Sequence, residues 1–453
     1  VTNNSIAIFF KNFLTARHIL ETCQTSADVI IGYTQLFAHR NGSQRIMDIV
    51  QTFQTKLHRE TVIAAAGRLS RLIETMPADS FSDVLSDGQG QEYLRIAADF
   101  LNEDNIRFRL KKELGKNYSK PKCFCPPYGI NSVQVRTVPL GTLFHIAAGN
   151  IDVLPAVSVL EGLLTGNVNI LKLPQADKGL TIWLFRNLIE YEPKLAPFVY
   201  IFDTPSTDIE AMKKMAEISD GISVWGGDEA VKAVRQLAPV NVKLMEWGHR
   251  LSFAYISGYT DKNREMTALA EHIAATRQLL CSSCQTIFID TDQRNAVVSF
   301  CKEFLPYLER AAEKFPHGNE TGVSAETTLR QCTERFEGHI GKAGERKCFK
   351  GRNCSVTACA DSVPELSYMY GNVLVKPLPR EYMLTNLRKA RGYLQTAGLI
   401  CKESDREALS EMLIRSGVNR VMKAGNMSVS FCGESHDGEY PLRRYVRIVN
   451  TEM

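Results

Sequence analysis

Two cysteines, Cys281 and Cys284, stand directly before a strand-like run in the segment RQLLCSSCQTIFID. Thiols at this spacing are compatible with half of a metal site, with a redox pair, or with a nucleophile beside an unrelated cysteine. A nucleophilic thiol needs surroundings that lower its pKa or supply a base. It also needs hydrogen-bond donors aimed at the oxyanion that forms when it attacks an acyl group.

The neighbouring sequence favours neither the metal site nor the redox pair. A structural zinc site uses four ligands, usually as two close pairs, and the downstream cysteines Cys348, Cys354 and Cys359 are spaced more widely than such a pair. A thioredoxin-like pair opens a helix that follows a strand. Here a helical segment, REMTALAEHIAATRQ, precedes the cysteines and a strand follows them. No metal is expected, and a redox-regulated, non-catalytic protein with a disulfide switch between Cys281 and Cys284 stays open as an alternative.

Other segments place polar or small residues where strands are expected to end. Asn150 follows the strand in LFHIAAGN, where a carboxamide can donate to an oxyanion, and Lys172 ends the strand in NVNILKLP. Gly226 and Gly227 link a strand to a helix, where small residues let a dinucleotide approach the start of the helix. Glu246 stands near the end of the strand in VKLMEWG. Because ligands meet parallel sheets at the carboxyl ends of strands, these positions predict a nucleotide site.

Apolar runs that alternate with amphipathic segments predict the elements that hold these residues. NVNILKLP, PFVYIFD, GISVWGG and VKLMEWG are expected strands of one α/β series, and LSFAYISGY and QTIFID begin a second. VQVRTVPLGTLFHIAAG is expected to form two strands. Residues 1 to about 118 show helical spacing, as in Ile46, Ile49 and Phe53, which is typical of core packing.

Composition limits the class of protein. With 453 residues, 44% hydrophobic and 23% charged, the chain has the composition of a globular protein of two or three domains. Its formal net charge of +4 is spread along the chain, so no nucleic-acid partner is expected. The apolar run from Ile6 to Phe10 is too short for a signal peptide or a membrane span. The 12 cysteines are therefore expected to be reduced thiols in a cytoplasmic protein.

In this order the segments resemble the aldehyde dehydrogenase superfamily. Its pattern is matched here by Asn150, Thr165-Gly166-Asn167, Lys172, Gly226, Glu246 and Cys281. Within the superfamily the chain resembles the LuxC-type acyl-CoA reductase family, typified by the fatty-acid reductase of bacterial bioluminescence. That narrower resemblance lies in LFHIAAGNI, in VWGG and in the tail RVMKAGNMSVSFCGESHDGEYPLRRYVRIV.

The resemblance implies an α/β, aldehyde dehydrogenase-like fold with two Rossmann-like parallel domains, a helical N-terminal region and an oligomerisation strand or tail. The expected boundaries are 1–130 for the helical part of the cofactor-binding domain and 131–247 for the NAD(P)-binding domain itself. Residues 248–415 are expected to form the catalytic domain. Residues 416–453 are expected to form a segment that packs back on the site or on an oligomer interface.

The resemblance also implies reduction of an acyl-CoA, of fatty acyl type, to the aldehyde. Cys281 is then the nucleophile, and Cys284 is a neighbour without a required role. The carboxamide of Asn150 and the backbone N–H of Cys281 are expected to hold the oxyanion. Lys172, Gln175, Gly226, Gly227 and Gly248 are expected to bind the cofactor.

The residue type at one sequence position favours NADPH over NADH as the cofactor. Many NAD-dependent superfamily members carry a glutamate three residues after the lysine, where this chain has Gln175. A neutral residue removes the repulsion against a 2′-phosphate, and Lys172 and Lys178 are available to pair with one.

Glu246 keeps a second activity open. In hydrolytic aldehyde dehydrogenases a glutamate here activates the water that cleaves the acyl-enzyme, which makes aldehyde oxidation the alternative to reduction. Its other interpretation is a residue that orients the thiol or binds a backbone amide. His249 and His436 are candidates for contact with substrate or with a loop, whereas His145 is expected to be a satisfied core residue.

The expected partners follow from the same resemblance. They are an acyl-CoA or acyl-protein donor, an acyl-protein synthetase, and further copies of the chain in a homodimer or homotetramer. The strand-like LRRYVRIV and VQVRTV are the candidates for joining subunits.

Overall fold

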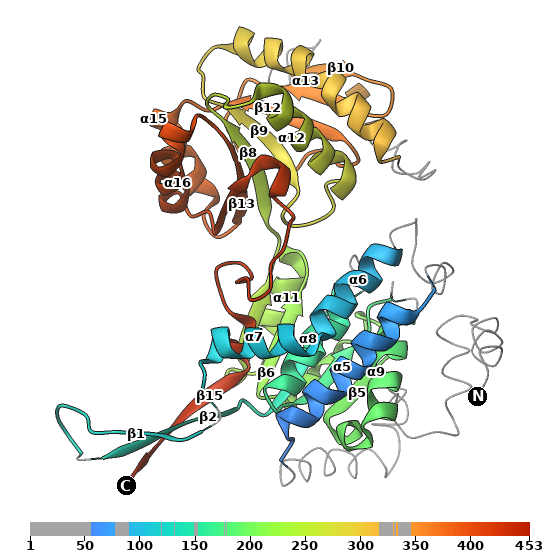
Figure 1. The fold of residues 1–453 in the computed structure, drawn as a ribbon, viewed down its shortest axis with the longest axis vertical. Coiled ribbons are helices and arrows are strands. Elements are labelled where there is room, and N and C mark those ends of the chain that lie inside the picture. The colour runs from blue at the N-terminus through green and yellow to red at the C-terminus, as the bar shows by residue number, and fades with distance from the viewer. Residues whose placement is uncertain are drawn as a thin grey trace. The chain divides into compact units, whose positions relative to one another are not determined.

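The computed structural model describes residues 56–77, 90–118, 120–130, 132–148, 153–175, 177, 179–316, 329, 332–333 and 346–453. The chain forms two compact units (Figure 1). The first unit contains the described residues up to Gly248 together with Phe431–Met453, and the second unit is His249–Ser430. Ile46, Ile49 and Phe53, on which a helical stripe was expected, lie outside the described residues.

The first unit is built on a parallel sheet of five strands, in the order β5-β4-β3-β6-β7. These strands are β3 (Thr142–Ile146), β4 (Val168–Lys172), β5 (Val199–Phe202), β6 (Gly221–Trp225) and β7 (Lys243–Trp247). The chain moves outward from β3 to β5 and then returns to the other side of β3 with β6. An open α/β sheet binds ligands outside the carboxyl ends of its strands at such a reversal, here between β3 and β6.

Helices surround this sheet. They are α5 (Arg59–Thr75), α6 (Gly90–Leu101), α7 (Glu103–Leu114), α8 (Leu154–Leu164), α9 (Leu180–Tyr191), the 3-10 helix η2 (Pro193–Phe198), α10 (Ile209–Glu217) and α11 (Asp228–Leu237). Val62, Ala66 and Leu69 recur at helical spacing on α5 and are buried in the core of the unit. The side chain of Asn102 caps α7 by accepting from two backbone N–H groups, and Gly115 caps the other end of this helix.

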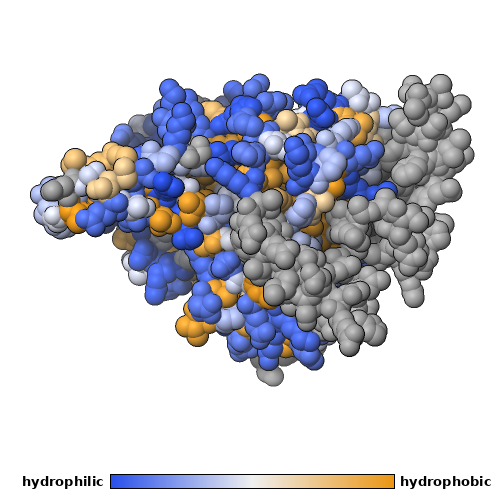
Figure 2. Space-filling view, turned by 90° about the horizontal axis from the view of Figure 1, so that it is seen from below, coloured by the Kyte–Doolittle hydropathy of each residue, from blue (hydrophilic) through white to orange (hydrophobic). Residues whose placement is uncertain are grey.

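A second, antiparallel sheet of the first unit has the order β1-β2-β15 (Figure 1). Its strands are β1 (Lys122–Phe124), β2 (Val133–Pro139) and β15 (Val446–Glu452), and the short helix α17 (Pro441–Arg444) precedes β15. The two strands expected in VQVRTVPLGTLFHIAAG are therefore confirmed as β2 and β3. Several apolar side chains of this sheet and its hairpin are exposed, Tyr128 and Ile448 among them. On the face drawn in Figure 2, hydrophobic residues lie scattered among hydrophilic ones.

The second unit is built on a sheet of seven strands, in the order β10-β11-β12-β9-β8-β13-β14, parallel except for the pair β10 and β11. The strands are β8 (Leu251–Ile256), β9 (Cys284–Ile289), β10 (Lys347–Lys350), β11 (Ser355–Ala358), β12 (Asn372–Pro377), β13 (Leu394–Ile400) and β14 (Arg420–Lys423). The helices are α12 (Lys262–Thr276), α13 (Arg294–Lys314), α15 (Arg380–Leu387) and α16 (Arg406–Arg415), with 3-10 turns η3 (Arg388–Ala390), η4 (Glu403–Asp405) and η5 (Ala424–Asn426).

Helices cover both faces of this second sheet (Figure 1). Along β8, Ala254 and Ile256 pack with α12 and α13, whereas Phe253 and Tyr255 pack with α15 and α16. Successive side chains of a strand point to opposite faces, so this strand is buried on both sides and reads as a continuous apolar run. The predicted α/β class with two parallel sheets is confirmed. Every helix that the structure describes is too short or too polar to cross a membrane.

Candidate functional site

Cys281 lies in a turn that joins α12 to β9. Its side chain is exposed. The hydroxyl of Ser252, on the neighbouring strand β8, donates to the carbonyl oxygen of Cys281 over 2.6 Å. A helix before the cysteines and a strand after them were predicted, and both are confirmed. The turn therefore presents one thiol to solvent from a fixed backbone.

Cys284 has a different environment. It opens β9 and is fully buried in the core of the second unit. Burial raises the pKa of this thiol to about 12. Its backbone N–H donates to Nε2 of His272 over 3.2 Å. Since the thiolate is the reactive form of cysteine, Cys284 is poorly suited to attack a substrate or a disulfide.

Residues that the sequence interpretation passed over hold this turn. Gln278, Gln285 and Ser367 are buried and hydrogen-bonded to one another. His272 accepts from Cys284, and burial lowers its pKa to about 4, so this imidazole stays neutral. The available signal was the pair of glutamines that flanks the two cysteines in the sequence.

In the first unit, two of the expected cofactor residues follow β4. Lys172 ends this strand and is 4% exposed. Burial lowers the pKa of Lys172, although the charge of Asp203 at the end of β5 acts in the opposite direction. Gln175 is exposed in the turn that follows. Lys178, the second lysine expected to meet a 2′-phosphate, lies outside the described residues.

Gly226 and Gly227 join β6 to α11, as predicted. Gly227 is the residue before the first turn of α11, and apart from its two chain neighbours no heavy atom of the described residues lies within 4 Å of the place a Cβ would take. The start of this helix is therefore open to a close approach, next to the reversal of the sheet. Backbone N–H groups at a helix start favour anions such as a pyrophosphate, so these residues fit a dinucleotide.

Glu246 is held by an arginine. On β7 its two carboxylate oxygens accept from Nε and Nη2 of Arg235 over 2.6 and 2.7 Å. These hydrogen bonds lower the pKa of Glu246 below its ordinary value. An effective general base has a pKa near the working pH and an oxygen directed at its proton, and this two-point pairing works against both. Gly248 follows β7 and is the last residue of the first unit before the chain enters the second.

The TGN segment, which carries part of the resemblance, links the C-terminal segment to the residue before β3 by hydrogen bonds of Asn167. The side chain of Asn167 donates to the carbonyl of Tyr445 over 3.0 Å and accepts from the N–H of Gly141 over 2.8 Å. The hydroxyl of Tyr445 lies 3.1 Å from Ser223 and 3.4 Å from Ser158. His145, fully buried on β3, contacts Ser158 over 2.8 Å. It is the satisfied core residue that the sequence predicted.

His436 packs against two tryptophans. Its ring centroid lies 4.9 Å from that of Trp225, at the end of β6, and 5.1 Å from that of Trp247, at the end of β7. The C-terminal tail thus reaches the strand ends beside Gly226. His249 belongs to the second unit, where its ring lies 6.2 Å from that of Tyr393.

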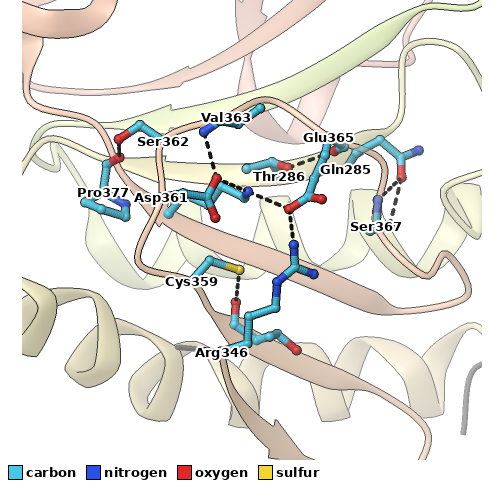
Figure 3. A network of polar contacts seen from close by, with 12 residues as sticks. Gln285, Thr286, Arg346, Cys359, Asp361, Ser362, Val363, Glu365, Ser367 and Pro377 are labelled. Carbon is cyan, nitrogen blue, oxygen red and sulfur yellow. Dashed lines mark hydrogen bonds and ion pairs between the residues drawn. The ribbon is translucent and has the colours of Figure 1, made fainter. Parts of the chain in front are cut away.

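One group among the described residues has metal-ligand types close together. Donor atoms of Cys359, Asp361 and Glu365 all lie within 4.8 Å of one another. However, the ammonium of Lys376 contacts both carboxylates, at 2.6 and 2.5 Å. We interpret this group as a salt-bridged structural cluster, because the lysine already supplies the positive charge. Cys359, Asp361 and Glu365 are drawn as sticks in Figure 3.

The candidate residues therefore fall into two groups. Lys172, Gly226, Gly227 and Glu246 stand at strand ends of the first unit, whereas Cys281 stands in the second. Asn150, the expected oxyanion donor, lies outside the described residues.

Each of the two units is an α/β unit built on a mainly or wholly parallel sheet, and comparison with solved structures shows that the chain has an aldehyde dehydrogenase-like fold. Betaine aldehyde dehydrogenase from Staphylococcus aureus, in complex with NAD⁺, aligns with a TM-score of 0.68 at 14% identity, over 91% of this chain and 86% of that one. Glyceraldehyde-3-phosphate dehydrogenase from Methanocaldococcus jannaschii, complexed with NADP, aligns with a TM-score of 0.67 at 11% identity, over 94% and 96%.

The chain belongs to the LuxC acyl-CoA reductase family, whose pattern matches residues 41–448. The long-chain acyl-protein thioester reductase of Aliivibrio fischeri is 24% identical over 330 residues, which are 70% of this chain. The matched part spans 65% of the length of that relative. The predicted family is therefore confirmed.

Proposed function

We propose that the protein reduces a fatty acyl thioester, such as an acyl-CoA, to the free aldehyde through an acyl-cysteine on Cys281. In the whole reaction the thioester, NADPH and one proton give the aldehyde, the free thiol and NADP⁺. Family membership supports this activity. The related proteins named as long-chain acyl-protein thioester reductases support the acyl thioester as substrate class.

The observation that carries the proposal is the contrast between the two cysteines. Cys281 is exposed in a turn, and its carbonyl is tied to Ser252. Cys284, three residues later, is buried with a raised pKa. Only the first has the access that attack on a bulky thioester requires.

In the proposed mechanism the acyl group is transferred to Cys281. The thiolate of Cys281 attacks the carbonyl carbon, a new C–S bond forms, and the C–S bond to the donor breaks, so that the donor leaves as a thiolate and takes up a proton. When bound, the reduced nicotinamide supplies the hydride that reduces the acyl-cysteine. The resulting thiohemiacetal then collapses, which breaks its C–S bond, releases the aldehyde and restores the thiolate of Cys281. Asn150 stays a predicted oxyanion donor.

NADPH is the proposed cofactor. The exposed Gln175 after β4 carries no charge that would repel a 2′-phosphate. Lys172, Gly226, Gly227 and Gly248 would hold the dinucleotide at the strand ends of the first unit. Proteins of this fold are known in complex with NAD⁺ and with NADP, so the fold by itself accommodates either cofactor.

The remaining proposals concern partners and location. We propose a fatty acyl donor that is either free acyl-CoA or an acylated protein, with an acyl-protein synthetase as a further partner. We also propose a homodimer or homotetramer and a cytoplasmic location. The exposed apolar side chains on β1, on the hairpin between β1 and β2, and on β15 support subunit contact through that sheet.

Two other activities are less well supported. Hydrolytic oxidation of an aldehyde would use Glu246 as a base, but the paired carboxylate with its lowered pKa disfavours that role. A regulatory disulfide between Cys281 and Cys284 would need the second thiol to ionise, which its burial opposes.

The test is NADPH absorbance with acyl-CoAs from acetyl to palmitoyl, for the wild type and for Cys281→Ala, Cys284→Ala and Glu246→Gln. We expect NADPH consumption with aldehyde formed, abolished by Cys281→Ala and kept by Cys284→Ala. Glu246→Gln should retain activity within about tenfold, because loss of a true general base costs about 10²–10⁴. If aldehydes reduce NADP⁺ while no acyl-CoA is turned over, and Glu246→Gln abolishes that activity, the hydrolytic alternative is correct.

A further inference from the structure

We infer that Gln278, together with Gln285 and Ser367, positions the turn that carries Cys281 for acyl transfer. This inference rests on the proposed role of Cys281 as nucleophile. All three side chains are buried, with 1%, 4% and 7% of their surface exposed, and they hydrogen-bond to one another and to the backbone on either side of Cys281. They are positioning residues, since they act through the backbone of the turn.

Gln278 joins the two ends of the turn that contains Cys281. Its side-chain nitrogen donates to the carbonyl of Cys284 over 2.9 Å, across the segment that contains Cys281. The same nitrogen donates to the hydroxyl of Ser367 over 2.9 Å, and its oxygen accepts from the N–H of Gly371 over 3.1 Å. One buried amide thus joins the start of the turn, the start of β9 and the loop between β11 and β12.

Gln285 and Ser367 complete a closed ring of hydrogen bonds. Gln285 donates to the backbone carbonyl of Gln278 over 2.7 Å and accepts from the hydroxyl and the N–H of Ser367 over 2.7 and 3.3 Å. Figure 3 shows Gln285 and Ser367 pointing toward one another. The hydroxyl of Ser367 donates once and accepts twice, from Gln278 and from the N–H of Met369, which exhausts its capacity.

The loop that carries Ser367 is itself anchored. Glu365 pairs with Arg346 over 2.7 Å and with the buried ammonium of Lys376 over 2.5 Å. The backbone carbonyl of Glu365 accepts from the hydroxyl of Thr286 on β9 over 3.0 Å (Figure 3). The ring therefore connects the cysteine turn to a fixed support and not to a surface loop that moves independently.

Unusual backbone conformations occur where the cysteine turn contacts the loop between β11 and β12. Arg277 and Gln278 have φ angles of 50° and 60°, and Met369 and Tyr370 have 60° and 49°. These left-handed conformations are uncommon outside glycine. The two strained pairs meet, because the N–H of Tyr370 donates to the carbonyl of Arg277 over 2.9 Å. Strain of this kind persists only where the surroundings impose it, and it gathers at functional sites.

The consequence is a nucleophile whose backbone is fixed on both sides. Hydrogen bonds of Gln278 and Gln285 join the start and the end of the turn. The hydroxyl of Ser252 on β8 donates to the carbonyl of Cys281 within it over 2.6 Å. Attack on a bound thioester requires the reacting atoms to be placed closely, and a displacement of about 1 Å can cost about 10²-fold in rate. Attack on a small freely diffusing reagent has no such requirement.

The experiment compares these two reactions of Cys281, attack on a bound thioester and attack on a small reagent. Variants Ser367→Ala and Gln278→Met break the ring, Ser367→Thr keeps the hydroxyl, and Ser416→Ala removes a buried hydroxyl elsewhere in the second unit as a matched control. In the full chain without NADPH, acylation of Cys281 by palmitoyl-CoA is followed by intact mass spectrometry over a range of concentrations. Alkylation of Cys281 by iodoacetamide is followed in parallel by peptide mass spectrometry.

We expect Ser367→Ala and Gln278→Met to slow the maximal acylation rate by about 10- to 100-fold at an unchanged half-saturating concentration. Their iodoacetamide rates should stay within about threefold of wild type, and Ser367→Thr and Ser416→Ala should acylate normally. Equal loss of both rates in the ring variants, or no loss of acylation, overturns the inference. A wild type that is not acylated at all rejects the proposed function instead.

Discussion

Two buried carboxylates in the first unit share one guanidinium, and this arrangement should make the stability of the protein depend on pH. Arg109 lies 2.5 Å from Glu161 and 3.5 Å from Glu113, which are 3% and 1% exposed. A second oxygen of Glu113 accepts from the N–H of Leu442 in the tail over 2.9 Å. Burial raises the pKa of Glu113 to about 7, although Arg109 and Arg443 act in the opposite direction.

The direction and the magnitude of this pH dependence follow from the difference in proton binding between the folded and the unfolded state. The folded state holds the proton of Glu113 more tightly than the unfolded chain, in which the carboxyl has its ordinary value of 4.5. Its contribution to stability is therefore complete below pH 4.5 and is lost as the pH rises through about 7. At about 1.4 kcal/mol for each pKa unit, the free energy of unfolding should fall by up to about 3 kcal/mol across this window.

The assay is urea unfolding of the wild type and of Glu113→Gln at about pH 5.5, 7.0 and 8.5. The amide cannot ionise, so the variant should lose the part of the decline that Glu113 causes and be the more stable protein at the highest pH. Burial also raises the pKa of Glu161, which should keep a remaining decline of the same sign. Glu217→Gln, which changes an exposed carboxylate near the end of α10, is the matched control and should keep the wild-type slope. A Glu113→Gln variant with an unchanged pH slope, or a wild type whose stability rises across the window, would refute the reasoning.

Three further outcomes test the cofactor site and the tail. Gly227→Ala should leave the free energy of unfolding unchanged or raise it by about 0.5 kcal/mol, because its methyl group meets open space, while the KM for NADPH rises about tenfold in steady-state kinetics. Gln175→Glu should shift the ratio of kcat/KM for NADH over NADPH about tenfold toward NADH; an unchanged ratio would mean that Gln175 does not face the 2′ position. Tyr445→Phe should lower the free energy of unfolding by about 1–2 kcal/mol in urea, since it removes hydroxyl contacts to Ser223 and Ser158.

The sequence predicted the elements well where the signal is local. Apolar runs bounded by Gly or Asn became strands, and Gly226 and Gly227 join β6 to α11 as expected. The position of Cys281 between a helix and a strand is likewise a property of adjacent residues. Local spacing and turn chemistry carry enough information for such features.

The partners of the site residues could not be predicted in this way. Ser367 meets Gln278 and Gln285 only because β12 pairs with β9, and nothing in the spacing of RQLLCSSCQT indicates that contact. Glu246 was weighed as a base, yet its carboxylate faces Arg235 on the helix that precedes its strand. Whether a polar residue is catalytic, positioning or structural depends on such distant neighbours, which the fold supplies.

The division of the chain has a consequence for how the protein is made. The first unit leaves off at Gly248 and resumes at Phe431, so the whole second unit is synthesised before the first can be completed. Until then β2 lacks its neighbour β15, and the space between Ser158 and Ser223 lacks the ring of Tyr445. On the ribosome the second unit can therefore close first, although it begins later in the chain, and the nascent first unit must wait with an unpaired strand edge.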